Sequence, residues 1–352
     1  MTAPPLPTPA RSAAGAGGDA SAPDHTGSSA PLPLRLRLAI AFALGAWGAF
    51  IAYFALAAAP EHLAKDFSWP WRAARAVLDG QNPYAVIRPT GPYPFNTGLF
   101  YPFPAAVVAL PFASLAPAVA GAAFVGVSSA LLAFGLSRDR AGAAKLPLFA
   151  SAPFCMAALL AQWAPLMVAG AVLPALQFLG AAKPNVALPC FAYRPTIRGI
   201  VLGAAFVAIT LLILPSWPLD WREALREAPR YRAPVTYAGG PLLLLALLRW
   251  RHAEARTLVA MSLMPQLTLF YDQLPLWLVP TTVWRSLGLS ALSWVAWAQW
   301  YPTRALPAHV ALARPWVFGL IYVPALLLVL APRAVSWRRA STVHDDRSTN
   351  AE

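Results

Sequence analysis

The sequence predicts an all-α polytopic membrane protein, and three observations support this class. Of the 352 residues, 58% are hydrophobic and only 12% are charged, whereas a soluble domain is about 45–50% apolar and about 25% charged. The mean hydropathy is +0.54. Hydrophobic runs recur from residue 38 to residue 332, which excludes a single membrane anchor joined to a soluble domain.

The net charge of +13 also fits a membrane protein. The sequence has no zinc-finger spacing, RNP motif or basic recognition helix, so we expect no nucleic-acid partner. Arginines that flank membrane spans favour the cytoplasmic side and contact anionic membrane lipid, and arginines on the outer side can bind phosphate. The two cysteines, Cys155 and Cys190, lie in apolar surroundings and are interpreted as small buried hydrophobic residues.

The chain begins with a predicted tail and a predicted span. Residues 1–33 are rich in Ala, Pro, Gly and Ser and lack apolar periodicity, which indicates a disordered tail. Arg35 and Arg37 precede the apolar run 38–59, which is long enough to cross a bilayer. Because basic flanks stay inside, we expect this tail and the C-terminal tail, 340–352, to be cytoplasmic.

Residues 34–339 are predicted to form one transmembrane domain with two outer loops, 60–99 and 216–238. We expect about 10–12 crossings, because short or proline-broken helices are tolerated at membrane depth where they pack in protein or line a cavity. The apolar runs after the first loop lie at 100–116, 118–136, 146–161, 164–182, 185–193, 199–215, 240–248, 257–271, 274–284, 286–300 and 315–332.

The positive-inside rule fits most of this topology. The basic clusters 249–256 and 333–339 fall inside, as the rule requires. Arg138, Arg140 and Lys145 would fall outside, so either the number of crossings before them is wrong by one or the charge bias is weak there.

The first outer loop contains a predicted amphipathic helix within 66–80. On a helix, Trp71 and Leu78 share one face, and Arg72 and Arg75 share another. We expect this helix to lie on the membrane surface with its apolar face down and its two guanidinium groups up.

Asp66 is the first candidate catalytic residue, because it lies where the chain leaves the first span. A carboxylate at the membrane–water boundary can act as a general base toward a sugar or lipid hydroxyl, while Arg72 and Arg75 hold a phosphate leaving group. The alternative, which composition alone favours, is a solvated carboxylate paired with Lys65 or Arg72.

Three further polar residues lie at the ends of apolar runs. Lys183 either extends to the interface or pairs with an anion. Asp272 is a candidate functional acid at the membrane interface, or it pairs with an arginine of the bundle. Gln162 is either a polar residue at a helix end or part of a substrate site.

Several short blocks in this order resemble glycosyltransferase family 87, over about residues 38–300. The blocks are Asp-Phe at 66–67, Ala-Arg-Ala-Val-Leu-Asp-Gly-Gln-Asn-Pro-Tyr at 74–84, Phe-Tyr-Pro-Phe-Pro at 100–104, Ala-Gln-Trp at 161–163, Ala-Lys-Pro-Asn at 182–185 and Phe-Tyr-Asp-Gln at 270–273. Members of that family usually have Gly-Gln where this chain has Ala161-Gln162, and Tyr-Pro-Pro where it has Tyr101-Pro102-Phe103.

The resemblance implies a GT-C membrane mannosyltransferase that uses a polyprenyl-phosphate sugar. In GT-C enzymes an acidic residue of the first outer loop is the catalytic base, and by position that residue is Asp66. The expected substrate-binding residues are Arg72, Arg75, Tyr101, Gln162, Lys183 and Asp272.

The expected reaction transfers a hexose, mannose by the resemblance, to a hydroxyl of a lipid or glycan on the outer face of the cell membrane, with inversion. No nucleotide-binding motif is present, and dependence on a divalent cation stays open. The alternatives are a transporter or flippase for a lipid-linked solute and a non-catalytic envelope assembly protein. An enzyme should have a cavity in which Asp66 faces Lys183 or Arg75.

Overall fold

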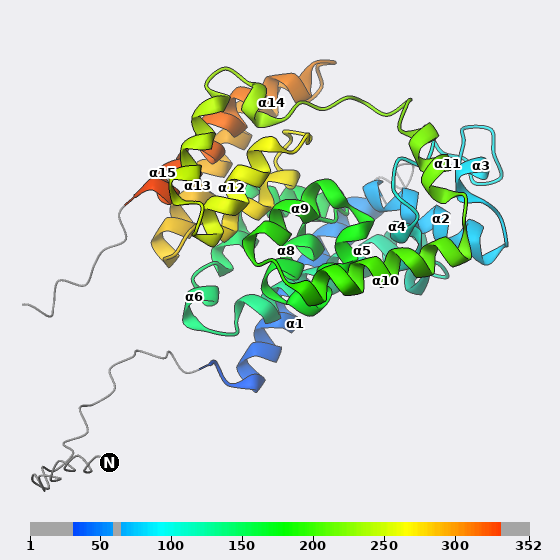
Figure 1. Ribbon diagram of the computed structural model, residues 1–352, viewed down its shortest axis with the longest axis horizontal. Helices are drawn as coiled ribbons and strands as arrows, with labels where there is room; N and C mark the ends of the chain where they lie inside the picture. The colour runs from blue at the N-terminus through cyan, green and yellow to red at the C-terminus, as the bar shows by residue number, and fades with distance from the viewer. Residues whose placement is uncertain (1–30, 59–64, 332–352) are drawn as a thin grey trace, which may run out of the picture. The chain divides into compact units, whose positions relative to one another are not determined.

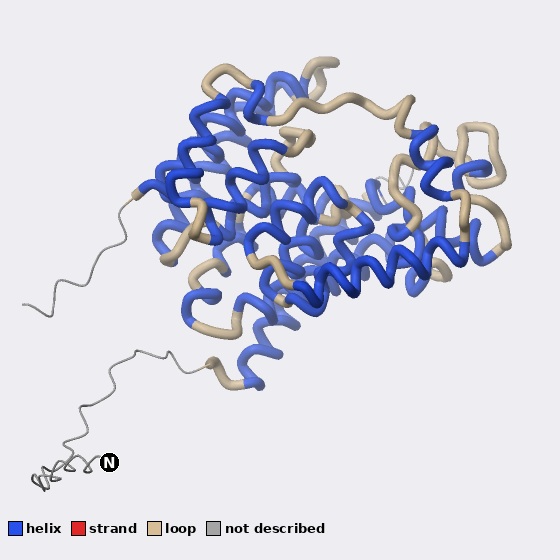
Figure 2. Tube along the Cα trace, viewed as in Figure 1, coloured by secondary structure: helices blue, strands red, loops and turns tan. Residues whose placement is uncertain are grey.

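The computed structural model describes residues 31–58 and 65–331. Within these residues every regular element is a helix (Figures 1 and 2), which confirms the predicted all-α class. Of the two predicted cytoplasmic tails, residues 1–30 and 340–352 lie outside the described residues.

The α-helices are numbered in chain order. They are α1 (Leu34–Ala57), α2 (Ser68–Leu78), α3 (Pro83–Val86), α4 (Pro104–Ala109), α5 (Pro117–Leu136), α6 (Arg140–Ala143), α7 (Ala152–Leu159), α8 (Ala164–Val172), α9 (Pro184–Tyr193), α10 (Ile197–Ile213), α11 (Trp217–Ala224), α12 (Ala253–Leu263), α13 (Val283–Trp300), α14 (His309–Val317) and α15 (Val323–Leu330).

Shorter helical segments lie between them. The 3₁₀-helices are η2 (Lys65–Phe67), η3 (Leu110–Phe112), η4 (Leu146–Ala150), η5 (Pro174–Ala182), η6 (Pro234–Thr236), η7 (Gly240–Arg249), η8 (Tyr271–Leu278) and η9 (Tyr301–Thr303), and a π-helical segment, η10 (Phe318–Tyr322), joins α14 to α15.

The apolar helices indicate insertion into a membrane, with fewer long spans than the sequence predicts. In the described part of the chain, three helical stretches are long and apolar enough to cross: Leu34–Ala57, Pro117–Leu136 and His309–Leu330. Two bent helix pairs raise the number to five. The expected 10–12 crossings exceed this because prolines and 3₁₀ segments break the other apolar runs into short pieces.

The start of α1 and the end of α5 lie at the same end of the helix pair. The Arg37 Nη2 donates to the Phe134 carbonyl over 3.2 Å, and the guanidinium lies 4.0 Å from the Phe134 ring centre. The predicted span 100–116 contains only the short helices α4 and η3. Residues 138–145 directly follow α5, so this basic segment begins at the same end of the helix pair as Arg37.

Several basic side chains cap the carboxyl ends of helices. Lys145 is buried, and its Nζ donates to the carbonyls of Leu278, over 2.9 Å, and Pro280, just beyond η8. Arg249 donates to the Ala331 carbonyl, over 2.8 Å, at the end of α15. Because positive charge stabilises the carbonyl end of a helix, these residues have a structural role.

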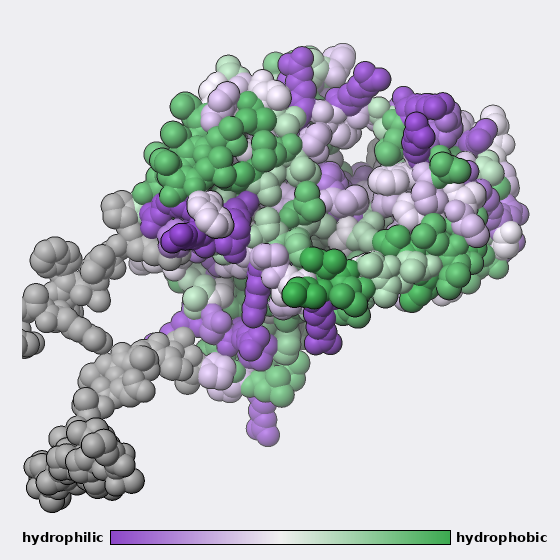
Figure 3. Space-filling model, in the orientation of Figure 1, coloured by the Kyte–Doolittle hydropathy of each residue, from purple (hydrophilic) through white to green (hydrophobic). Residues whose placement is uncertain are grey.

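The outward side of α10 fits a lipid-facing surface. Ile197 is 80% exposed and Leu212 is 83% exposed, and hydrophobic residues cover much of this helix in Figure 3. α10 leads into α11, which lies beside α3 (Figure 1).

Glycine allows α1 and α5 to approach closely, and this gives a stability prediction. A Cβ added at Gly45 would lie 2.8 Å from the Ala130 Cβ and 3.0 Å from the Gly126 carbonyl oxygen. We expect Gly45→Ala to lower the free energy of unfolding by about 1–3 kcal/mol, because the two helices must separate.

The matched control is Gly288→Ala in α13, where an added Cβ meets nothing within 4 Å. The free energy of unfolding of that variant should rise by up to about 1 kcal/mol, because alanine is a better helix former than glycine. Thermal unfolding of both variants in the same detergent checks the prediction, and equal midpoints would contradict it.

Candidate functional site

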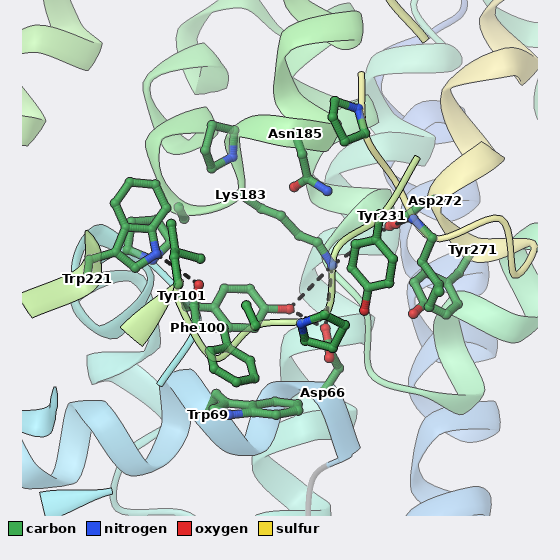
Figure 4. A pocket seen from close by; sticks show the side chains of 18 residues that line it. Asp66, Trp69, Phe100, Tyr101, Lys183, Asn185, Trp221, Tyr231, Tyr271 and Asp272 are labelled. Carbon is green, nitrogen blue, oxygen red and sulfur yellow. Dashed lines mark hydrogen bonds and ion pairs between the residues drawn. The ribbon is translucent and has the colours of Figure 1, made fainter. Parts of the chain in front are cut away.

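Lys183 is the centre of a cluster of polar side chains (Figure 4). Its Nζ lies 3.5 Å from the Asp66 Oδ2 and 3.8 Å from the Asp272 Oδ1. It also donates to the Gln162 Oε1 over 2.7 Å. One ammonium group is therefore shared by two carboxylates and an amide.

Tyr101 closes the cluster on the side of Asp66. Its hydroxyl donates to the Asp66 Oδ2 and accepts from the Lys183 Nζ over 3.3 Å. The ammonium group lies 5.6 Å from the centre of the Tyr101 ring and 5.8 Å from that of Tyr271. These two rings add cation–π attraction to the ion pairs.

The cluster forms one wall of a cavity of about 420 Å³. In Figure 4, Trp69, Phe100, Tyr101 and Trp221 lie on one side of Lys183, and Tyr231, Tyr271 and Asp272 lie on the other. The volume is within the range of about 300–1,000 Å³ that is typical of small-molecule sites. A cavity with aromatic walls and a few converging charges can hold a ligand with both apolar and anionic parts.

The two carboxylates differ in their access to the cavity. The Asp66 side chain is 20% exposed, whereas that of Asp272 is 4% exposed. Burial raises the pKa of Asp272 above its ordinary value, and the nearby Lys183 ammonium acts in the opposite direction. Asp66 is thus the carboxylate that an incoming hydroxyl can reach, while Asp272 lies behind Lys183.

Three non-glycine residues with left-handed backbone directly precede the site residues. They are Lys65 (φ +51°) before Asp66, Ala161 (φ +49°) before Gln162, and Phe270 (φ +66°) before Tyr271 and Asp272. Such conformations cost about 1–3 kcal/mol each and concentrate at functional sites. The strained residues therefore lie in the same three segments that contribute Asp66, Gln162 and Asp272 to the cluster around Lys183.

Phe270 is the centre of a γ-turn that directs Asp272 toward Lys183. The Tyr271 N–H donates to the Leu269 carbonyl over 2.8 Å, two residues back, and Phe270 has φ +66° and ψ −60°. The Leu267 N–H then donates to the Asp272 Oδ2 over 3.3 Å. This bond uses one carboxylate oxygen and leaves the other for Lys183.

The backbone joins the segments that carry Asp66 and Gln162. The Asp66 N–H donates to the Leu160 carbonyl over 3.1 Å, and the Gln162 N–H donates to the Ala157 carbonyl over 2.8 Å. Ala161 lies between these two bonds in its left-handed conformation. The conformation at Ala161 thus sets how the two segments meet.

We expect Ala161→Gly to raise the free energy of unfolding by about 0.5–1 kcal/mol, because glycine adopts this conformation without steric cost. Ala161→Val should lower the free energy of unfolding by more than Ala161→Gly raises it, since β-branched residues disfavour a positive φ. Thermal unfolding checks both variants, and the prediction fails if glycine destabilises the protein as much as valine does.

Arg72 and Arg75 differ from their predicted placement, because neither lines the cavity. The Arg72 side chain is only 7% exposed, its Nε donates to the Pro94 carbonyl over 3.0 Å, and its guanidinium lies 4.7 Å from the Phe95 ring centre. Arg75 is exposed and lies over Trp71. Arg72 therefore holds the outer loop onto α2.

The prediction that both guanidinium groups of this helix face solvent is wrong for Arg72 and agrees with the exposure of Arg75. Arg72 is buried under the loop, whereas Leu78, expected on the apolar face, is 65% exposed. Trp71, on the same predicted face, is instead buried in the core of the protein.

Sequence reasoning missed the aromatic residues that the second outer loop contributes. Trp221 and Tyr231 line the cavity, and the Trp221 Nε1 donates to the Phe100 carbonyl over 2.9 Å. The predicted loop 216–238 is rich in aromatic and charged residues. This composition was the feature of the sequence from which a contribution to the cavity could have been predicted.

Across the described ranges, no group of three or more His, Cys, Asp or Glu side chains is arranged to bind a metal. Asp66 and Asp272 instead lie on either side of Lys183.

The comparisons with known proteins give no family for this chain. No family model matches it, and neither a curated protein nor a solved structure matches it. The resemblance to glycosyltransferase family 87 therefore rests on the sequence blocks alone.

Proposed function

We propose that this protein is a membrane glycosyltransferase that moves a hexose, mannose by the family resemblance, from a polyprenyl-phosphate donor to a hydroxyl of a lipid or glycan. The observation that supports this proposal is the pairing of Asp66 and Lys183 over 3.5 Å at the wall of a largely aromatic cavity. A base and a cation side by side are what glycosyl transfer from a phosphate requires.

In this mechanism Asp66 accepts the proton of the acceptor hydroxyl. The acceptor oxygen forms a bond to the anomeric carbon as the bond from that carbon to the phosphate oxygen breaks, with inversion of configuration. The electron pair leaves with the polyprenyl phosphate. The sugar ring lies against the aromatic side chains of the cavity, such as Trp69 and Trp221.

Lys183 stabilises the leaving phosphate in this mechanism. Without a ligand its charge is shared by Asp66 and Asp272. A donor phosphate competes for the ammonium group, and moving Lys183 from Asp66 to the phosphate frees the base for the acceptor. Gln162, only 2.7 Å from the Nζ, keeps the lysine oriented during this exchange.

The GT-C-like architecture and the topology belong to the same proposal. Arg37 lies in the first turn of the first candidate span, Leu34–Ala57, and Asp66 is nine positions beyond its last residue. With Arg37 and the capping residue Lys145 on the cytoplasmic side, the site faces the outer leaflet. Short and broken helices between the long spans then complete the bundle around a lipid-linked donor.

The direct test is transfer by the purified protein in proteoliposomes. The donor is polyprenyl-phosphate mannose with a labelled sugar, and the acceptors are a lipid and glycan extract of the host membrane. We expect label to move to the acceptor with release of polyprenyl phosphate. Movement of intact donor across the bilayer without cleavage would instead identify a flippase, and neither activity would favour an assembly protein.

A further inference from the structure

A second cavity, of about 630 Å³, lies between the first outer loop and α11. We call it the α11 groove. A larger share of its lining is polar than in the cavity at Asp66, whose walls are largely aromatic. The residues that line it are Asn82, Tyr84, Ala85, Arg88, Pro89, Thr90, Asn96, Thr97, Gly98, Leu99, Asp220, Glu223, Ala224 and Glu227.

The α11 groove and the cavity at Asp66 share two walls. On α11 and the turn after it, Asp220 and Glu227 line the groove, whereas Trp221 lines the cavity. In the outer loop, Leu99 lines the groove and its neighbour Phe100 lines the cavity. The two hollows are thus separated by a single chain segment on one side and a single helix on the other.

Hydrogen bonds fix this shared wall. The Tyr84 hydroxyl donates to the Tyr101 carbonyl over 2.9 Å. The Trp69 Nε1 donates to the Gly98 carbonyl, also over 2.9 Å. The groove is therefore built onto the segment that carries Tyr101, which bonds to Asp66.

Some of the polar groups in the groove hold its shape. The Asp220 Oδ2 accepts from the Asn82 Nδ2 over 2.9 Å, which ties α11 to the first outer loop. Others are available to a ligand: among the described residues, the exposed side chains of Glu227, Asn96 and Arg88 have no hydrogen-bond partner.

We propose that the α11 groove binds the outer residues of a neutral oligosaccharide. Sugar hydroxyls donate to carboxylates such as Glu227 and accept from amide and guanidinium groups such as Asn96 and Arg88. Three carboxylates and one guanidinium line the groove, and in the ranges that the structure describes only one of these carboxylates, Glu223, is paired with an arginine outside the lining, Arg226. The remaining negative charge disfavours a phosphate or another anion. The groove thus complements the cavity at Asp66, where Lys183 provides the cation for a phosphate.

This ligand assignment rests on the proposed function in one respect only. If Asp66 activates an acceptor hydroxyl, the groove holds the sugars behind that hydroxyl, and the acceptor is a glycan of several residues. Binding of the oligosaccharide itself does not require transfer.

The test is a binding measurement on the full-length protein in lipid nanodiscs, without sugar-based detergent. The probes are α-linked mannotriose, methyl α-mannoside, inorganic phosphate and trilysine, followed by saturation-transfer NMR and calorimetry. We expect mannotriose to bind more tightly than the single-ring methyl α-mannoside. Trilysine or phosphate as the only ligand would overturn the proposal.

Asn96→Ala and Gln81→Ala form a matched pair of variants. Both remove an exposed amide from the same loop, but only Asn96 lines the groove. Asn96→Ala and Glu227→Gln should each weaken mannotriose binding by about threefold to tenfold, the effect of one lost hydrogen bond. Gln81→Ala should bind as the wild type does, and equal binding by all variants would overturn the proposal.

Failure of this proposal and failure of the proposed function are distinguishable. Asp66→Asn should keep mannotriose binding while losing transfer. Binding that depends on Asn96 in a protein without transferase activity would reject the function and retain the groove. If the protein transfers hexose but its mannotriose binding does not change in the Asn96 and Glu227 variants, the proposed function is retained and the groove proposal is rejected.

Discussion

Asp66→Asn should lower the rate of hexose transfer by about 10²–10⁴-fold, the usual contribution of a positioned general base. Asparagine has nearly the shape of aspartate, and its side-chain oxygen can still accept from the Tyr101 hydroxyl. Lys183 keeps Asp272, at 3.8 Å, and Gln162, at 2.7 Å, as partners. The substitution therefore removes the proton acceptor and leaves the packing of the site in place.

The matched control is Asp79→Asn. Asp79 belongs to the same outer loop and accepts from the Tyr93 hydroxyl, but it does not line the cavity. Initial rates in proteoliposomes should fall for Asp66→Asn alone, with both variants retaining the wild-type unfolding midpoint. If folded Asp66→Asn transfers at close to the wild-type rate, Asp66 is not the base.

The all-α class was predictable because it depends on composition alone. Apolar side chains in a chain with few charges have to face lipid or each other, whatever the order of the helices. The number of crossings was not predictable in this way. An apolar run such as 100–116 looks like a span, but prolines divide it into α4 and η3.

Positions at the ends of apolar runs pointed to four residues of the candidate site one by one, but only the sequence blocks grouped them into one site. Asp66 and Lys183 are 117 positions apart, and no periodicity or local pattern brings such residues together. The blocks supplied Tyr101, Gln162 and Asp272 as well, and the structure places all five in one cluster.

The predictions that were wrong or missing concern residues whose surroundings depend on contacts between distant parts of the chain. Arg72 was expected to face solvent on a helical pattern, but the loop around Pro94 folds over it and accepts its hydrogen bond. The strained conformations at Lys65, Ala161 and Phe270 leave no clear trace in residue type, because glycine is absent from all three positions. Tertiary contacts, which overdetermine these conformations, are invisible to local sequence analysis.

Lys183→Met should destabilise the protein by about 3–5 kcal/mol, because it leaves the charge of a buried pair without its partner. The Lys183 side chain is 11% exposed and that of Asp272 is 4% exposed, so water cannot replace the ammonium group. The matched control is Lys65→Met. Lys65 has no ion pair within the described residues, so its replacement should have little effect on stability.

The loss of stability in Lys183→Met should depend on pH. Burial already raises the pKa of Asp272, and Lys183 opposes this effect, so removing the lysine raises that pKa further. The ordinary pKa of aspartate is about 4. Above this pH, Asp272 has lost its proton in the unfolded state of the variant but still holds it in the folded state. The free energy of unfolding of the variant therefore falls as the pH rises through the pKa of the folded state.

The double variant Lys183→Met with Asp272→Asn separates this charge effect from the loss of packing. Without the buried carboxylate the folded state no longer retains an extra proton there, so the pH dependence should flatten and part of the lost stability should return at neutral pH. Unfolding midpoints between pH 4 and pH 8 for the two variants provide the measurement. Parallel curves would mean that Asp272 does not depend on Lys183 for its charge, and that the ion pair at the centre of the site has no energetic role.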